Sequence, residues 1–187
     1  MGILVQELLK LPIINGQRVK LRPVTLADAA AMFAYASDAA TADYIFPVHH
    51  SLEDSKNTIL DFFMAHPAGQ YGIALRDNDL LIGTLQLQNL DEYNRKASLA
   101  FVLHPSYQHQ GYMQESLHAL IAILFQQTSI QRLYALHEPA NQASAKVMLA
   151  TGMQQEGLLQ QTSFIRHHFV DGCLHAITRE QYFKGVN

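Results

Sequence analysis

The chain has 187 residues, of which 49% are hydrophobic and 16% are charged, a composition typical of one globular domain with a sizeable core. Its formal net charge is −3, and Lys and Arg form no run, which argues against nucleic-acid binding through a broad basic face. No stretch reaches the roughly 18 apolar residues of a membrane span. The single cysteine, Cys173, excludes an internal disulfide. We therefore expect one domain over 1–187, in a cytoplasmic enzyme or binding protein.

The first half of the chain predicts one strand and two helices around a loop. Residues 19–24, VKLRPV, alternate in polarity and are typical of a strand. Two residue pairs have the spacing of a capping pair that begins a helix: Thr25 with Asp28 and Ser51 with Asp54. We expect an alanine-rich helix after the first pair, a helix near 51–65 after the second, and a loop at 43–50 between them.

Three consecutive segments in the middle of the chain predict strands: 70–76, 80–88 and 96–103. The polar run RDND at 76–79 joins the first two as a hairpin turn, so we expect an antiparallel meander. A long helix follows from about residue 112. Its apolar residues recur on one face: Leu117, Leu120, Ile121, Leu124 and Phe125.

The last third of the chain predicts a strand at 132–138 and a short helix at 141–152 that ends at Gly152. A further strand and a hairpin follow, and Asp171-Gly172 is the expected turn of the hairpin. One strand–helix–strand unit therefore lies among antiparallel pairs. The expected fold class is a mixed α/β sheet, mostly antiparallel and flanked by helices, rather than a doubly wound sheet.

The loop HPSYQHQG at 104–111 connects the strand 96–103 to the long helix. The first N–H groups of a helix and the positive end of its dipole bind anions. Gly111 allows a positive φ or a close approach of a phosphate to the backbone, although two bulky residues, His109 and Met113, flank it. One glycine alone does not distinguish a phosphate cradle from an ordinary strand-to-helix turn.

The surrounding sequence resembles the GNAT acetyltransferase superfamily. Gln108-x-x-Gly111-x-Met113 is similar to the glutamine/arginine-x-x-glycine-x-glycine/alanine motif with which that family holds the pyrophosphate of acetyl-CoA. Three longer blocks resemble family segments in the same order: GQRVKLRPVTLADA, LAFVLHPSYQHQGYMQESLHALIAILF and NQASAKVMLATGMQQEG. The resemblance covers roughly residues 14–182. The nearest branch is that of the ribosomal-protein N-acetyltransferases and their spermidine- and amine-acetylating relatives.

The resemblance implies the GNAT fold and acetyl-CoA as cosubstrate. The strand 96–103 would separate from the next strand, bind the pantetheine arm through its main chain and supply an oxyanion donor. The loop N–H groups would hold the pyrophosphate, with Gln108 shaping the loop. Asn141 would hydrogen-bond the coenzyme, cap a helix, or do both. The expected coenzyme-binding residues are Phe101, Val102, Leu103, Gln108, His109, Gln110, Gly111, Tyr112, Met113, Gln114, Asn141 and Ser144.

The resemblance also implies catalytic residues. Ser144 matches a serine near the coenzyme sulfur, where a hydroxyl would protonate the leaving thiolate; the alternative is a solvent-facing serine. An amine acceptor must lose a proton before attack, and histidine has a suitable pKa, so His104 is the predicted base. Glu115 is interpreted as a structural residue of the first helical turn. A bound water is an equal alternative as base, and so are several side chains: His49, His50, His137 and Glu138.

Four positions depart from the family pattern. Ser98 stands where many relatives have a glutamate general base, and Met148 stands where others have a tyrosine acid. Met113 and His109 replace small residues of the loop. Main-chain donors do most of the coenzyme binding in this family, so binding is still expected, with Met113 and His109 crowding the loop. Because of these departures, the sequence does not identify the general base or the acceptor substrate.

The sequence therefore favours an acetyl-CoA-dependent N-acetyltransferase in which an amine, either a protein N-terminus or a small molecule, attacks the thioester directly. The alternatives are a coenzyme-A-binding sensor or partner protein with lost or minimal catalysis, and a purely structural domain. Exposed strand edges of this fold often pair, which leaves a homodimer open. The ten histidines include no H-E-x-x-H and no helical i, i+4 pair, so we expect no metal. We also expect no nucleic-acid or membrane partner.

Overall fold

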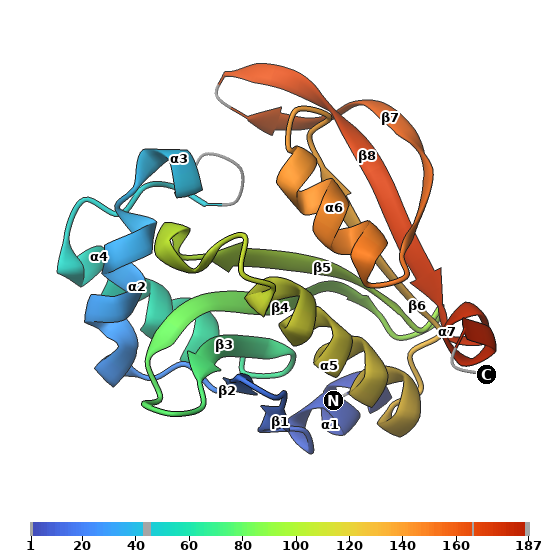
Figure 1. Cartoon of the computed structure of the whole chain (residues 1–187), viewed down its shortest axis with the longest axis horizontal. Coiled ribbons are helices and arrows are strands. Elements are labelled where there is room, and N and C mark those ends of the chain that lie inside the picture. The colour runs from blue at the N-terminus through green and yellow to red at the C-terminus, as the bar shows by residue number, and fades with distance from the viewer. Residues whose placement is uncertain (1, 43–45, 166, 186–187) are drawn as a thin grey trace.

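The computed structural model describes residues 2–42, 46–165 and 167–185. Within these ranges the chain forms one sheet with strand order β1-β2-β3-β4-β5-β6-β8-β7 and helices on both faces (Figure 1). The described neighbouring strands pair antiparallel, except that β5 and β6 pair in parallel. The expected mixed, mostly antiparallel α/β sheet is confirmed.

The strands are β1 Ile14–Asn15, β2 Val19–Arg22, β3 Gln70–Leu75, β4 Leu81–Asp91, β5 Lys96–Leu103, β6 Arg132–His137, β7 Gln154–Ile165 and β8 His168–Thr178. The α-helices are α1 Ile3–Leu9, α2 Ala29–Ala36, α3 Ala39–Ala42, α4 Leu52–Thr58, α5 Tyr112–Gln127, α6 Gln142–Ala150 and α7 Arg179–Gly185. Three shorter segments complete the described elements: the 3₁₀ turns η1 Leu26–Asp28 and η3 Pro105–Tyr107, and the π-helical turn η2 Ile59–Met64.

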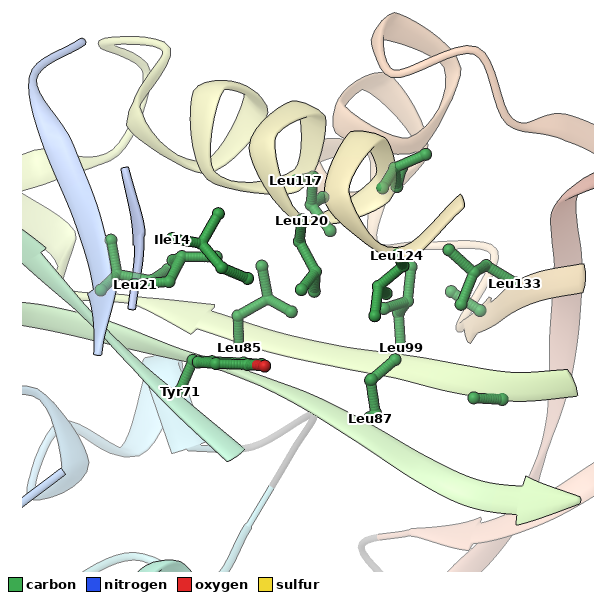
Figure 2. Close-up of a cluster of buried hydrophobic side chains, with 14 of the residues drawn as sticks. Ile14, Leu21, Tyr71, Leu85, Leu87, Leu99, Leu117, Leu120, Leu124 and Leu133 are labelled. Carbon is green, nitrogen blue, oxygen red and sulfur yellow. The ribbon is translucent and has the colours of Figure 1, made fainter. Parts of the chain in front are cut away.

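One face of the sheet carries α1, α5 and α6 and holds the larger core. Leu117, Leu120 and Leu124 of α5 lie over Leu85 and Leu99 of the strands (Figure 2). Each of these five side chains is at most 5% exposed, and burying a leucine contributes roughly 1.5–3 kcal/mol. This packing fixes α5 over the sheet, and the apolar face predicted for the helix is confirmed.

The opposite face carries α2, α4 and η2 over a smaller core. Its buried residues include Val24, Met32, Tyr35, Ile59, Phe63 and Val102. Both predicted capping pairs form as capping boxes: Thr25 and Asp28 begin η1 ahead of α2, and the Ser51 hydroxyl accepts a hydrogen bond from the Asp54 backbone N–H at 3.2 Å to begin α4. The sequence signals for both helix starts are therefore confirmed.

The predicted hairpin turn at Asp171-Gly172 is wrong. Both residues lie within β8, which pairs with β7 as far as Ile165 opposite His168. Gly172 serves close packing rather than a turn, because a Cβ at this position would lie 2.5 Å from Cγ2 of Thr162. The two strands therefore form a longer hairpin than expected, which projects beyond the rest of the sheet (Figure 1).

The structure also contains elements that the sequence patterns did not predict: α1, β1, α3 and α7. In α1, only Leu4 and Leu8 are buried, and two residues are too few to establish a helical period. Of the loop expected at 43–50, residues 43–45 lie outside the described residues. No helix in the described ranges has both the length and the apolar character required to cross a membrane.

Candidate functional site

β5 and β6 separate along their length, and a cleft opens between them. They pair at three positions: Lys96 with Arg132, Ala97 with Leu133, and Ser98 with Tyr134. Beyond these pairs, residues 99–101 of β5 and residues 136–138 line a cavity of about 300 Å³. We call it the β5–β6 cleft. Backbone groups without a strand partner can hydrogen-bond the amides of a peptide-like ligand, and the expected separation of the strands is present.

The N-terminal half of α6 and the β7–β8 hairpin form further walls of the β5–β6 cleft. Asn141, Ser144, Met148 and Ser98 all line it. The Asn141 side chain caps α6 by accepting a hydrogen bond from the Ser144 backbone N–H at 3.1 Å. The Ser98 hydroxyl lies 2.9 Å from the side-chain amide of Asn89, which donates to it. The structure thus brings the predicted Asn141 and Ser144 together with Ser98 and Met148, two of the positions that depart from the family pattern.

The glycine loop lies at the end of β5, where α5 begins. Gly111 is the N-cap of α5 with φ +81°, and His109 has φ +59°. Gln108 shapes the loop, since its side-chain amide donates to the Leu103 carbonyl oxygen at 2.9 Å. The first N–H groups and the dipole of the 16-residue helix α5 make this end a site for an anion.

Met113 does not crowd the loop as the sequence suggested. It is 6% exposed and packs into the larger core, whereas the side chain of His109 is exposed. The loop residues do not line the β5–β6 cleft, but they follow β5, whose Phe101 does. Val102 and Leu103 are buried in the two cores, so they can reach a ligand only through the main chain. A ligand that occupies both places must extend along β5.

His104 also follows β5 directly, and it caps the turn η3. Its Nδ1 accepts a hydrogen bond from the Ser106 backbone N–H at 3.1 Å. Its ring meets the rings of Tyr35 and Tyr107 edge-on, with centroid distances of 6.5 Å and 5.6 Å. His104 does not line the β5–β6 cleft. Its role as a base therefore stays a prediction, and this geometry gives it no support.

A second cavity, of about 760 Å³, lies on the opposite face of the sheet between α2, α4, η2 and β4. We call it the α2–α4 chamber. Thr84, Gln86 and Gln88 line it from β4, since alternate residues of a strand share a face. Apolar and aromatic side chains also line it: Met32, Tyr35, Phe46, Phe62 and Phe63. Gln88 also lines the β5–β6 cleft, so the two cavities meet at this residue.

The α2–α4 chamber is acidic. Asp54 and Asp61 line it, and its described lining contains no Lys or Arg. Hydrogen bonds from the backbone N–H groups of His50 and Ser51 help hold the pKa of Asp54 below its usual value, so this carboxylate is charged near neutral pH. The side chain of Asp61 makes no hydrogen bond or ion pair with the described residues, which leaves its carboxylate available to a ligand.

His49 and His50, alternatives for the base, line the α2–α4 chamber. His49 is 8% exposed. Its Nδ1 lies 2.8 Å from the Ser55 hydroxyl, and its Nε2 lies 3.2 Å from the Thr58 hydroxyl. Burial lowers the pKa of His49, so its imidazole is neutral at pH 7.

His137, another alternative base, lines the β5–β6 cleft. Its Nδ1 lies 2.7 Å from the Glu138 carbonyl oxygen, which requires the proton on this nitrogen. Its Nε2 is buried without a hydrogen-bond partner among the described residues. The His137 ring stacks at 5.0 Å on the ring of His175, whose pKa is lowered by burial and by His137.

Of the residues that line the α2–α4 chamber, the sequence pointed only to His49 and His50. A usable signal was present in TLQLQ, where polar residues alternate with apolar ones in a strand that is covered on both faces. Tyr35 and Phe62 carry no comparable local signal, since they reach the chamber through the packing of α2 and η2. Among the described His, Cys, Asp and Glu residues, no group could hold a metal ion.

Comparison with known proteins agrees with this geometry. Residues 18–154 match the family model described as an acetyltransferase (GNAT) domain. The uncharacterized N-acetyltransferase YoaA of Bacillus subtilis is 29% identical over 80% of this chain and 87% of its own. The ribosomal-protein-serine acetyltransferase of Escherichia coli is 29% identical over 67% of this chain and 71% of its own. RimL, a ribosomal L7/L12 alpha-N-protein acetyltransferase solved in complex with coenzyme A, has the same fold. It has a TM-score of 0.78 and 22% identity, covering 89% of this chain and 97% of its own.

The family match covers more than half of the chain and includes β5, the glycine loop and the whole of α6. The relatives include a ribosomal-protein acetyltransferase, as the resemblance of the sequence blocks predicted. The expected fold and the expected N-acetyltransferase class are confirmed, and the chain belongs to the GNAT acetyltransferase family.

Proposed function

We propose that this protein transfers the acetyl group of acetyl-CoA to an amine by direct attack on the thioester. The observation that carries the proposal is the meeting of the β5–β6 cleft and the α2–α4 chamber at Gln88. A thioester in the cleft and an amine in the chamber would meet there from opposite sides. Cys173 lies in β8 and lines neither cavity, which supports a reaction without a covalent enzyme intermediate.

The coenzyme would lie along β5, from the β5–β6 cleft to the glycine loop. The N–H groups at the start of α5 would hold the pyrophosphate, and the left-handed Gly111 would let it approach the backbone. The β5 backbone at 99–103 would hydrogen-bond the pantetheine arm, with Asn141 and Ser144 on the opposite wall. RimL, a neighbour of the same fold, is solved in complex with coenzyme A, which supports coenzyme A as the ligand.

The reaction itself needs few protein groups. The amine nitrogen attacks the thioester carbonyl carbon, so that a C–N bond forms, the C–S bond breaks and the sulfur leaves as a thiolate. A backbone N–H of β5 would stabilise the oxyanion that forms on the carbonyl oxygen. The Ser144 hydroxyl would donate a proton to the thiolate and regain one from water, which takes up the proton that the amine loses.

The α2–α4 chamber suits an amine with an apolar body. An ammonium group can interact with the aromatic side chains that line it, and the carboxylates of Asp54 and Asp61 would attract the same charge. An acceptor that carries carboxylates would be repelled. The N-terminus of a protein and a small amine both satisfy these requirements, and the ribosomal-protein acetyltransferase among the relatives favours the former.

Calorimetric titration with acetyl-CoA, followed by thiol release across an amine panel, tests the proposal. The panel should contain alkylamines, arylalkylamines, and N-terminal peptides that begin with apolar or acidic residues. We expect saturable binding of acetyl-CoA and faster thiol release with apolar amines and peptides than with acidic peptides. Binding without thiol release from any amine would favour the alternative, a coenzyme-A-binding protein with lost catalysis. Absence of binding would contradict both.

A further inference from the structure

We propose that Arg18, in the turn between β1 and β2, is the cationic side chain that binds a coenzyme phosphate at the glycine loop. This inference rests on the proposed function. Residues 104–115, which form the loop and the first turn of α5, contain no Lys or Arg. Gln108, at the first position of the motif, is uncharged. Any positive side chain that adds to the main-chain donors at the phosphates must therefore come from another part of the chain.

Arg18 is held against the loop by three contacts. Its Nε donates to the Glu115 carboxylate at 2.9 Å, and its Nη1 donates to the Gln110 carbonyl oxygen at 3.0 Å. Its Cζ lies 4.5 Å from the centre of the Tyr112 ring. A Cβ added to Gly111 would lie 3.3 Å from Nη2 of Arg18. The guanidinium therefore lies beside the residue whose left-handed backbone opens the anion site.

The guanidinium of Arg18 keeps donors for a ligand. It has five N–H groups, of which Nε and Nη1 use one each within the protein, and Nη2 donates to none of the described residues. The side chain is 49% exposed, so a ligand on the loop can reach it. A planar guanidinium with two free N–H groups on one side matches the oxygens of a phosphate.

Glu115 keeps Arg18 in this place. Besides the guanidinium, its carboxylate accepts the backbone N–H groups of Arg18 at 2.6 Å and of Val19 at 3.2 Å. Burial alone would raise the pKa of Glu115, but these hydrogen bonds outweigh it and the pKa is lowered. Glu115 therefore positions the turn, in line with its interpretation as a structural residue. Arg18 could also serve only as a structural partner of Glu115, without binding phosphate. The experiment must distinguish these two roles.

Three variants make this separation: Arg18→Gln, Arg18→Lys and Arg76→Gln. Arg76 is the matched control, because its Nη1 donates to the Gly16 carbonyl oxygen at 2.9 Å in the same turn, and its side chain has no hydrogen bond to the described residues of the loop. Each protein is titrated calorimetrically with coenzyme A over a range of salt concentrations, and with pantetheine, which lacks the phosphates. Thermal unfolding without ligand reports whether each variant is folded.

We expect Arg18→Gln to weaken coenzyme A binding about tenfold and to reduce its salt dependence, since one charge–charge contact is lost. The affinity of Arg18→Lys for coenzyme A should lie between those of Arg18→Gln and the wild type, because lysine keeps the charge but lacks the planar guanidinium. Arg76→Gln should bind as the wild type does, and pantetheine should bind all four proteins alike.

Two results would overturn the inference while the proposed function stands. In the first, Arg18→Gln binds coenzyme A as tightly as the wild type. In the second, it loses affinity for coenzyme A and pantetheine equally with an unchanged salt dependence, which would show a structural role only. If the wild type binds no coenzyme A, the proposed function fails and the inference fails with it.

Discussion

Gly111 and Gly172 are glycines for different physical reasons. Gly111 has φ +81°, a left-handed conformation in which other L-residues pay roughly 1–2 kcal/mol. Gly172 lies in a strand, and it is required because a Cβ would lie 2.5 Å from Cγ2 of Thr162. The motif around Gly111 marks the first case in the sequence. No local pattern in the sequence indicates the close packing at Gly172, and the pair Asp171-Gly172 instead resembles a hairpin turn.

Replacing Gly111 by Val should weaken coenzyme A binding tenfold or more, equivalent to about 1.4 kcal/mol. A β-branched residue is strained at φ +81°, and its Cβ would lie 3.3 Å from Nη2 of Arg18, so the loop N–H groups must shift. Calorimetric titration with coenzyme A measures the change. Gly157→Val in β7 is the control, because a Cβ there meets nothing within 4 Å. Equal affinities of the two variants would contradict the placement of the pyrophosphate.

His49 should make the stability of the protein depend on pH. Burial lowers its pKa in the folded state, whereas in the unfolded chain it titrates near the ordinary value of about 6.5. Below that pH the unfolded chain binds a proton that the folded chain does not, so the free energy of unfolding falls as the pH falls. Urea denaturation at about pH 7.5 and about pH 5.5 measures this loss.

The variant His49→Gln should lose less stability between these two pH values than the wild type does. Its free energy of unfolding at pH 7.5 should already be lower than that of the wild type, because the hydrogen bonds to Ser55 and Thr58 are lost. His175, whose pKa is also lowered, leaves part of the pH dependence in place. His118→Gln on the exposed side of α5 is the control. A pH dependence of His49→Gln identical to that of the wild type would exclude His49 as its source.

At the scale of elements, η2 and the β7–β8 hairpin build walls of the two cavities. η2 continues α4 as a π-helical turn and brings Asp61, Phe62 and Phe63 to the α2–α4 chamber. The capping pair at Ser51 predicts where the helix begins, but the wider π-turn is a local departure of the kind often found at functional sites, and no signal in the sequence marks it. The hairpin adds Thr162 and Gly172 to the β5–β6 cleft.

Replacing Gly172 by Ala should destabilise the protein by roughly 1–3 kcal/mol, because the new methyl group would meet Thr162 and, at 3.1 Å, Cδ2 of Leu136. Thr162→Ser removes the methyl group nearest to Gly172, so the double variant should recover part of the loss. Urea denaturation of the two single variants and the double variant gives the coupling energy. Additive effects would show that the two residues do not meet.

At the scale of the whole molecule, the sequence predicted what depends on local pattern. Capping pairs, strand alternation and the apolar face of α5 predicted most elements, and the family motif located the glycine loop and Asn141. The chamber could not be assembled in this way, because it joins α2, the segment 46–50, η2 and β4. Arg18 and Glu115 are likewise 97 residues apart, and only the packing of α5 against β2 brings them together.

The meeting of the two cavities at Gln88 predicts that coenzyme binding and acetyl transfer can be separated by one substitution. Gln88→Trp would fill the junction, while the glycine loop and most of β5 keep their contacts with the coenzyme. We expect the affinity for coenzyme A to change by no more than about threefold, and kcat/KM for the amine to fall at least about tenfold. Calorimetry and a thiol-release assay measure the two quantities. Gln126→Trp on the exposed side of α5 controls for the added ring. Unimpaired transfer by Gln88→Trp would mean that the amine reaches the thioester by a route other than the α2–α4 chamber.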